Sequence, residues 1–330
     1  MIDFRYHVIS LVSVFLALAV GIVLGAGPLN EGISTGITDQ VRQLTEEREQ
    51  LRAERDEALA VGEAQDAWAE AVAPAVVERQ LGGRTVAVVQ LPGADASTTD
   101  AAVEVLREAG ATVPALVTVQ DDWTDEAQEG AREELAADLA ERLAADGGTA
   151  VTGEAPEVLA AALSRALVTG DLAQTVVDDP ARTELLTALA DAGLVEVDGE
   201  VTQRSTLVLL VAGPPDADAS DARAEADTAA WAALAEQLDE RSAGAVVAGP
   251  TESSEAGGAV AAVRAVDEIA EQVSTVGDLD TAIGRVNVVL ALREQLADRS
   301  GHYGTGPGAT SVSPPLPAAL ANPSPAPAAQ

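Results

Sequence analysis

The hydrophobic pattern begins with one long apolar run near the N-terminus. Val8 to Ala26 contains no charged residue, and these 19 residues would extend about 29 Å as a helix, close to the thickness of a bilayer's hydrocarbon core. Residues 8–27 are therefore predicted to form a transmembrane helix behind a short cytoplasmic tail, residues 1–7. A cleaved signal peptide is the alternative, although its apolar region would be unusually long.

The residues around this run predict its orientation and its pairing. Arg5 and His7 precede it and the next Arg is Arg42, so the positive-inside rule places the N-terminus in the cytoplasm and the bulk of the chain outside. The expected location is thus the cell membrane, with a single pass. Small residues recur at every fourth position, which favours close packing of two membrane helices through Ala17, Gly21 and Gly25.

The second pattern is a heptad repeat within residues 34–81. Its apolar positions predict a coiled-coil stalk and a parallel homodimer, with Arg48 and Arg55 also at core positions. The alternative is a single surface helix held by local ion pairs. Pro74 is expected to kink or break the helix, and glycines 82–83 to end it. The predicted stalk interface consists of Ile37, Val41, Leu44 and Leu51.

The third pattern covers residues 84–300, where short apolar runs alternate with amphipathic segments. This alternation predicts an α/β domain with a mostly parallel sheet covered on both faces, a Rossmann-like three-layer fold. The expected strands are 85–91, 112–119, a weak one at 150–152, 205–212, 245–248 and 273–276, with a small hairpin at 194–201. The expected helices are 98–109, 125–145, 156–167, one starting at 179–180, 222–241, 257–266 and 281–297.

The tail, residues 301–330, has a different composition. It starts with a glycine-rich stretch around His302 and Tyr303 and continues as a Pro/Ala/Ser segment. The latter half is expected to be disordered or polyproline-like. For the glycine-rich stretch two interpretations remain open, docking on the α/β domain and a flexible linker.

Composition excludes several kinds of site. The chain has no Cys, one Met and two His, which removes disulfides, thiolate metal sites and Cys nucleophiles. Its net charge of −35 and pI near 4.1 argue against binding nucleic acid. There is neither a P-loop nor a G-x-G-x-x-G after the first strand, and a Ser-His-Asp triad is not expected. We therefore expect no enzymatic activity. The alternative is an extracytoplasmic enzyme such as a carboxylate-pair hydrolase, since acidic residues are abundant and no pair is singled out.

Two candidate sites remain. Strands of a parallel sheet end at one edge, where ligands usually bind, and three predicted strand ends carry Gly or Pro. The residues of this candidate ligand edge are Gly93, Gly213, Gly249 and Thr251, although plain turns would use the same residues. His302 is the one candidate metal ligand after the apolar run.

Two blocks of sequence resemble a known family. Residues 1–25, MIDFRYHVISLVSVFLALAVGIVLG, resemble the start of the actinobacterial copper transport protein B family. GHYGTG at residues 301–306 and the helix containing Gly284 and Arg285 are similar to it as well. The resemblance implies a cell-envelope protein with a role in copper homeostasis or transport, and copper as its cargo.

The residues themselves favour a different mechanism. Cu(I) prefers Cys and Met and Cu(II) prefers imidazole, and the chain offers few of these ligands. No tightly bound cofactor is therefore expected. The alternative to copper transport is a dimeric extracytoplasmic scaffold that binds another envelope protein and has no direct copper site.

Overall fold

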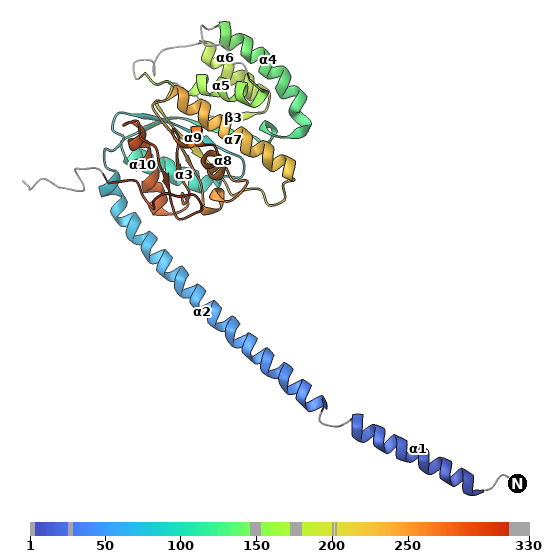
Figure 1. The fold of residues 1–330 in the computed structure, drawn as a ribbon. Helices are drawn as coiled ribbons and strands as arrows, with labels where there is room; N and C mark the ends of the chain where they lie inside the picture. Colours follow the sequence, from blue (N-terminus) through green and yellow to red (C-terminus); the bar gives the residue numbers. More distant parts are fainter. Residues whose placement is uncertain are drawn as a thin grey trace, which may run out of the picture. The chain divides into compact units, whose positions relative to one another are not determined.

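In the computed structural model the described residues are 4–25, 29–145, 153–171, 180–199, 201 and 203–316. They belong to two compact units, Met1–Gln65 and Asp66–Gln330 (Figure 1). The first unit contains α1 (Phe4–Gly25) and most of α2 (Leu29–Val77), and the second contains the end of α2 and the α/β domain.

The helix α1 has the length and composition of a membrane span. Phe4–Val23 has a mean hydropathy of 2.3, and none of this window is buried inside the structure. An apolar helix whose side chains all face outward is stable only where something other than water surrounds it. The predicted N-terminal apolar helix is confirmed, and α1 starts four residues before the apolar run.

The helix α2 is longer at its start and shorter at its end than the predicted stalk. It begins at Leu29 rather than residue 34 and ends at Val77 rather than residue 81. Pro74 does not break the helix, as one form of the prediction had it, because α2 continues through this residue to Val77. Pro74 lies in the last turn, where the loss of one N–H removes few bonds. Arg79 and Gly83 then turn the chain with positive φ angles of 60° and 74°.

The sheet of the second unit has seven strands in the order β3-β2-β1-β4-β5-β6-β7. All neighbours are parallel except β2 and β3, so the prediction of a mostly parallel sheet is confirmed. Every residue of β4 is buried, as expected for a strand covered on both faces. The strands are β1 (Thr85–Gln90), β2 (Thr112–Val119), β3 (Val195–Asp198), β4 (Leu207–Val211), β5 (Ala245–Ala248), β6 (Ser274–Val276) and β7 (His302–Tyr303).

Two details of the predicted sheet need correction. Residues 194–201 do not form a hairpin of their own, because β3 pairs in antiparallel fashion with β2, about 80 residues earlier. The α/β domain also does not end at residue 300, because β7 pairs with β6 as the last parallel strand. The weak strand predicted at 150–152 lies outside the described residues.

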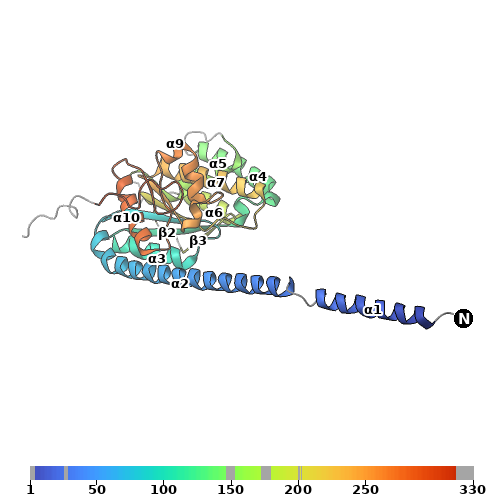
Figure 2. The same ribbon diagram turned by 60° about the horizontal axis from the view of Figure 1, so that its bottom comes forward.

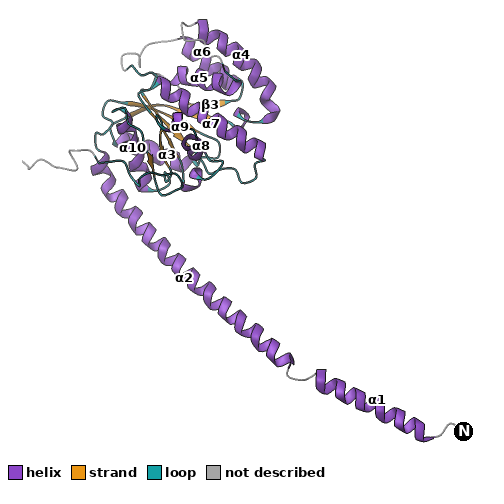
Figure 3. Ribbon diagram, viewed as in Figure 1, coloured by secondary structure: helices purple, strands orange, loops and turns teal. Residues whose placement is uncertain are grey.

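Helices cover the sheet on both faces, as Figures 2 and 3 show. One face packs against α3 (Ala96–Glu108), α10 (Ala282–Gln295) and the end of α2 at Val77. The other face packs against α7 and α8, with α5 beside α7 and with α4 and α6 packed on α5. The helices of this second layer are α4 (Glu129–Ala145), α5 (Ala155–Leu167), α6 (Pro180–Asp191), α7 (Asp221–Arg241), α8 (Ala259–Ala265) and α9 (Asp267–Ala270).

The side of the sheet to which successive strands are added changes between β1 and β4. From β1 the chain moves to one side through β2 and β3, then returns to the other side of β1 as β4 and continues to β7. Loops leaving β1 and β4 therefore diverge to opposite faces, which opens a space above the carboxyl ends of these two strands.

Candidate functional site

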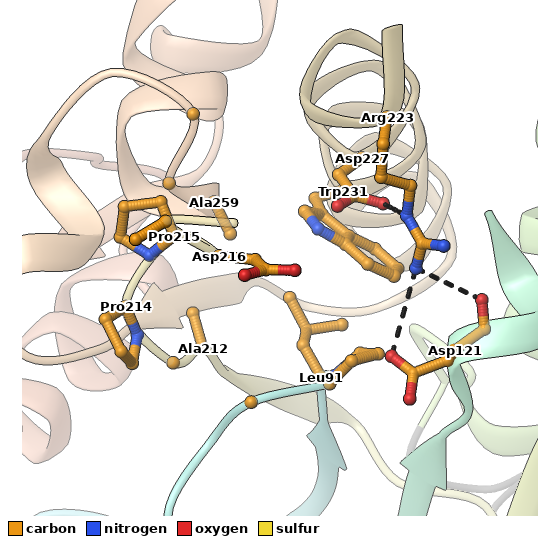
Figure 4. A pocket seen from close by; sticks show the side chains of 16 residues that line it. Leu91, Asp121, Ala212, Pro214, Pro215, Asp216, Arg223, Asp227, Trp231 and Ala259 are labelled. Atoms are coloured by element: carbon orange, nitrogen blue, oxygen red, sulfur yellow. Dashed lines mark hydrogen bonds and ion pairs between the residues drawn. The ribbon is translucent and has the colours of Figure 1, made fainter. Parts of the chain in front are cut away.

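A cavity of about 440 Å³ lies above the carboxyl ends of β1 and β4, where the strand order reverses. Open parallel sheets bind their ligands at this kind of position. The lining comes from four parts of the chain that are distant in sequence: Leu91–Gly93, Asp121, Ala212–Ala217 with Arg223, Asp227 and Trp231, and Gly257–Ala259 (Figure 4).

Two of the four glycine and threonine positions predicted for the ligand edge line this cavity. Gly93 has a φ of +75°, and a Cβ at Gly213 would lie 2.2 Å from the carbonyl oxygen of Gly93. The loops after β1 and β4 therefore touch at their backbones, and a side chain at Gly213 would separate them. Gly249 and Thr251 lie at the same edge of the sheet but are not part of the cavity lining.

One wall of the cavity is the first half of α7. Ser220 caps this helix by accepting a hydrogen bond from the backbone N–H of Arg223. The Arg223 guanidinium donates to Asp227 Oδ1 at 2.9 Å and to the carbonyl oxygen of Asp121 at 3.2 Å. Two of the three carboxylates in the lining thus lie beside this one cation, since Asp121 Oδ1 is also 3.8 Å from it.

The indole of Trp231 lies next to this ion pair on the same wall. Its side chain is only 7% exposed. This wall could hardly be predicted from the sequence, since Arg223, Asp227 and Trp231 have the spacing of ordinary helix residues. Their four-residue spacing after the most apolar strand was the available signal.

The charged side chains that line the cavity differ from those of nucleotide-binding sites at the same edge of other parallel sheets. Three carboxylates and one guanidinium line it. Phosphate binding uses backbone N–H groups at a helix start together with basic side chains; this lining includes the start of α8 at Gly258 and Ala259, but its one guanidinium is outnumbered by three carboxylates. Among the described residues there is also no group of three or more His, Asp or Glu that could hold a metal ion.

A second group of polar residues holds the glycine-rich stretch to the domain. The Arg264 guanidinium donates to Thr275 Oγ1 at 2.8 Å, to the carbonyl oxygen of Tyr303 at 3.1 Å and to that of Pro307 at 2.5 Å. The Tyr303 hydroxyl donates to Glu294 of α10. Of the two interpretations of this stretch, the structure therefore has the docked one, with His302 and Tyr303 forming β7.

His302 faces this cluster rather than a set of metal ligands. Its Nδ1 lies 3.0 Å from Thr275 Oγ1. Burial and the nearby charge of Arg264 lower the pKa of His302, which favours the neutral ring. No described carboxylate or second imidazole completes a metal site around it.

Asp278 is a buried carboxyl at the end of β6. Its side chain is 5% exposed, and Oδ1 has no hydrogen-bond partner among the described residues. Burial raises the pKa of Asp278 to about 6; the charge of Asp280 adds to this rise and that of Arg264 opposes it. The sequence could not indicate this, because a single Asp after a strand is usually solvated.

The predicted dimer residues of the first unit face outward. Val41, Leu44 and Leu51 are 57%, 63% and 65% exposed. A Cβ added at Gly21 or Gly25 would meet nothing within 4 Å, and Ala17 is exposed as well. The side chain of Ile37 lies outside the described residues. The structure contains one chain, so these residues remain predictions of an interface.

Comparison with known proteins connects this architecture to a family. The model of the family described as copper transport outer membrane protein, MctB, matches residues 1–314. The chain belongs to the MctB family. Proteins named copper transporter MctB from Mycobacterium tuberculosis and Mycobacterium bovis are 29% identical over 321 residues, which cover 94% of this chain and 99% of theirs. The Mycobacterium leprae protein of the same name is 29% identical over 96% of this chain and all of its own length.

The MctB match includes α1, α2, the sheet and the glycine-rich stretch that forms β7, and it stops at residue 314. The predicted resemblance, which rested on residues 1–25 and 301–306, is confirmed.

Proposed function

We propose that this protein is a membrane-anchored cell-envelope protein that acts in copper homeostasis and transport. The family match over residues 1–314 carries this proposal, together with the mycobacterial relatives that are named copper transporters. The apolar helix α1 supports the membrane anchor.

The architecture we propose is a single-pass parallel dimer. Arg5 before α1 favours a cytoplasmic N-terminus and an extracytoplasmic α/β domain. The outward-facing heptad residues of α2 favour a coiled coil, because exposed Val and Leu at this spacing are buried by a second helix. The strand order supports a Rossmann-like classification, with the antiparallel β3 as its departure.

We further propose that one chain has no high-affinity Cu(I) site and is not an enzyme. The chain contains no Cys, a single Met and two His, so soft ligands cannot converge in one protomer. Carboxylates are abundant, yet they prefer Mg, Ca or Mn. Copper handling would then depend on a partner in the envelope, and the protein would act as a scaffold for it.

The deciding experiment is copper competition with the full-length protein in nanodiscs. In a Cu(I) titration against a chromogenic chelator, we expect the chelator to retain the metal, and Cu(II) binding to be weak and reduced by His302→Ala. Stoichiometric Cu(I) retained at low free copper would contradict the absence of a site and favour direct transport. A copper-sensitivity assay in a strain lacking the protein tests the broader role. Unchanged copper tolerance would refute it.

A further inference from the structure

The glycine-rich stretch closes into a small loop, residues 302–311, which we call the strap. The backbone N–H of Thr310 donates to the carbonyl oxygen of His302 at 2.8 Å, and that of Gly304 donates to the carbonyl oxygen of Ser311 at 3.1 Å. Gly304 has a φ of +118°, which lets the chain turn this tightly. The strap is therefore a defined structure that follows the last strand of the sheet.

The strap lies against two buried oxygen atoms, Asp278 Oδ1 and Ser254 Oγ, which have no hydrogen-bond partner among the described residues. Asp278 is 5% exposed and Ser254 is 3% exposed. A Cβ at Gly304 would lie 3.4 Å from Asp278 Oδ1, and a Cβ at Gly306 would lie 3.0 Å from Ser254 Oγ. The backbone of the strap thus packs against both side chains and contributes to their burial.

One cation, Arg264 of α8, holds the strap in place. Its guanidinium donates to the carbonyl oxygens of Tyr303 and Pro307 at 3.1 and 2.5 Å. The third nitrogen donates to Thr275 of β6 at 2.8 Å. The backbone N–H of Gly277 adds a bond to the carbonyl oxygen of Tyr303 at 3.0 Å.

This arrangement opposes ionisation of Asp278 while the strap is closed. A buried carboxylate needs hydrogen-bond partners, and Oδ1 has none in the described part of the chain. The charge of Arg264 favours the ionised form, but its three nitrogens donate to the strap and to β6. Asp280 in the same loop disfavours the ionised form, and burial is the main reason that the pKa of Asp278 is raised to about 6.

The other charged groups on the surrounding elements are engaged elsewhere or exposed. Glu294 of α10 accepts from the Tyr303 hydroxyl, and Arg285 lies 3.4 Å from Glu70. His302 Nδ1 lies 3.0 Å from Thr275 Oγ1, and the lowered pKa of His302 favours closing at higher pH, opposite to the effect of Asp278. The remaining groups are Asp66, which accepts the backbone N–H of Ala282, and the exposed Glu252 and Glu255 beside Ser254.

We propose that ionisation of Asp278 loosens the strap, so that this carboxyl favours a closed strap in acidic surroundings and a looser one at neutral pH. The ionised carboxylate gains water only when the strap moves away, and it gains the Arg264 guanidinium only when that group leaves the strap. Because Gly306 covers Ser254 and Thr251, an open strap uncovers both at the carboxyl edge of the sheet, where parallel sheets bind ligands. The switch is independent of the copper role.

The test is hydrogen exchange of the full-length protein in nanodiscs at about pH 5 and about pH 7.5, with each rate divided by the intrinsic rate at the same pH. The amides of Gly277 and of residues 309–311 report opening, since their bonds end on the strap. With the ordinary pKa of 3.8 in the open state and about 6 in the closed one, Asp278 should raise opening about tenfold between these pH values. We therefore expect the pH response of the wild type to exceed that of Asp278→Asn about tenfold, because the effect of His302 is common to both and cancels.

Two further variants complete the test. Asp198→Asn changes an exposed carboxyl of β3 and should respond to pH as the wild type does. Ser254→Cys places a thiol beneath the strap of a chain that has no Cys, so its reaction rate with 4,4′-dithiodipyridine measures opening directly. Its pH response should likewise exceed that of the double variant with Asp278→Asn about tenfold. Equal pH responses with and without Asp278→Asn, in either measurement, would overturn the proposal.

Discussion

Replacing Asp278 by Asn should make the protein more stable at neutral pH. The carboxyl is buried with an unpaired oxygen, and its pKa is raised from 3.8 to about 6. Between these values the folded protein binds a proton that the unfolded chain has released, so stability falls as pH rises through this window. A difference of about 2 pKa units corresponds to a penalty of about 3 kcal/mol at neutral pH, which disappears below about pH 4.

The assay is chemical denaturation of the full-length protein in detergent, followed by Trp emission, at about pH 4 and about pH 7.5. Trp123 and Trp231 are buried in the α/β domain and report its unfolding. We expect Asp278→Asn to gain about 2–3 kcal/mol relative to the wild type on going from the lower to the higher pH. Comparing the two pH values cancels any misfit of the amide, since that contribution is independent of pH.

Two further variants distinguish this cause from a general loss of negative charge. Asp280→Asn removes the charge that adds to the raised pKa of Asp278, so it should move the transition in stability to lower pH. Asp198→Asn changes an exposed carboxyl of β3 and should leave the pH dependence as it is in the wild type. If Asp278→Asn has the same pH profile as the wild type, the carboxyl is solvated or paired and the reasoning is refuted.

Three other predictions follow from packing. Gly213→Ala places a Cβ 2.2 Å from the carbonyl oxygen of Gly93 and should lower the free energy of unfolding by about 1–3 kcal/mol. The control Gly62→Ala adds a Cβ that meets nothing within 4 Å and should not lower it. Equal denaturation midpoints for the two variants would contradict this prediction. Arg264→Met removes the hydrogen bonds to the carbonyl oxygens of Tyr303 and Pro307, along with one to Thr275 of β6. Hydrogen exchange should therefore speed up in residues 302–308; unchanged protection there would show that the guanidinium is dispensable. A Cys at Leu44, a heptad core position, should crosslink to a second chain under oxidation far faster than one at Glu46 on the outer face; equal rates would exclude the parallel coiled coil.

Much of the architecture could be read from local patterns. An uninterrupted apolar run such as Val8 to Ala26 specifies a membrane helix because its length and lack of charge leave few alternatives. The strands β1 and β4 were also predictable, since short runs of Val, Leu and Ala bounded by Gly and Pro are typical of buried parallel strands. Two glycines of the cavity were found by the rule that parallel strands share a carboxyl edge.

The remaining features depend on contacts between residues far apart in the chain. Residues 302–303 are too short to show a strand pattern, and they form β7 because β6 and Arg264 supply the bonds. The cavity wall at Trp231 and the raised pKa of Asp278 likewise arise from neighbours that only folding brings together. The sequence therefore determined the order of anchor, helix and α/β domain, because these depend on local periodicity. Tertiary structure decided burial and pairing, which set the chemistry of each polar group.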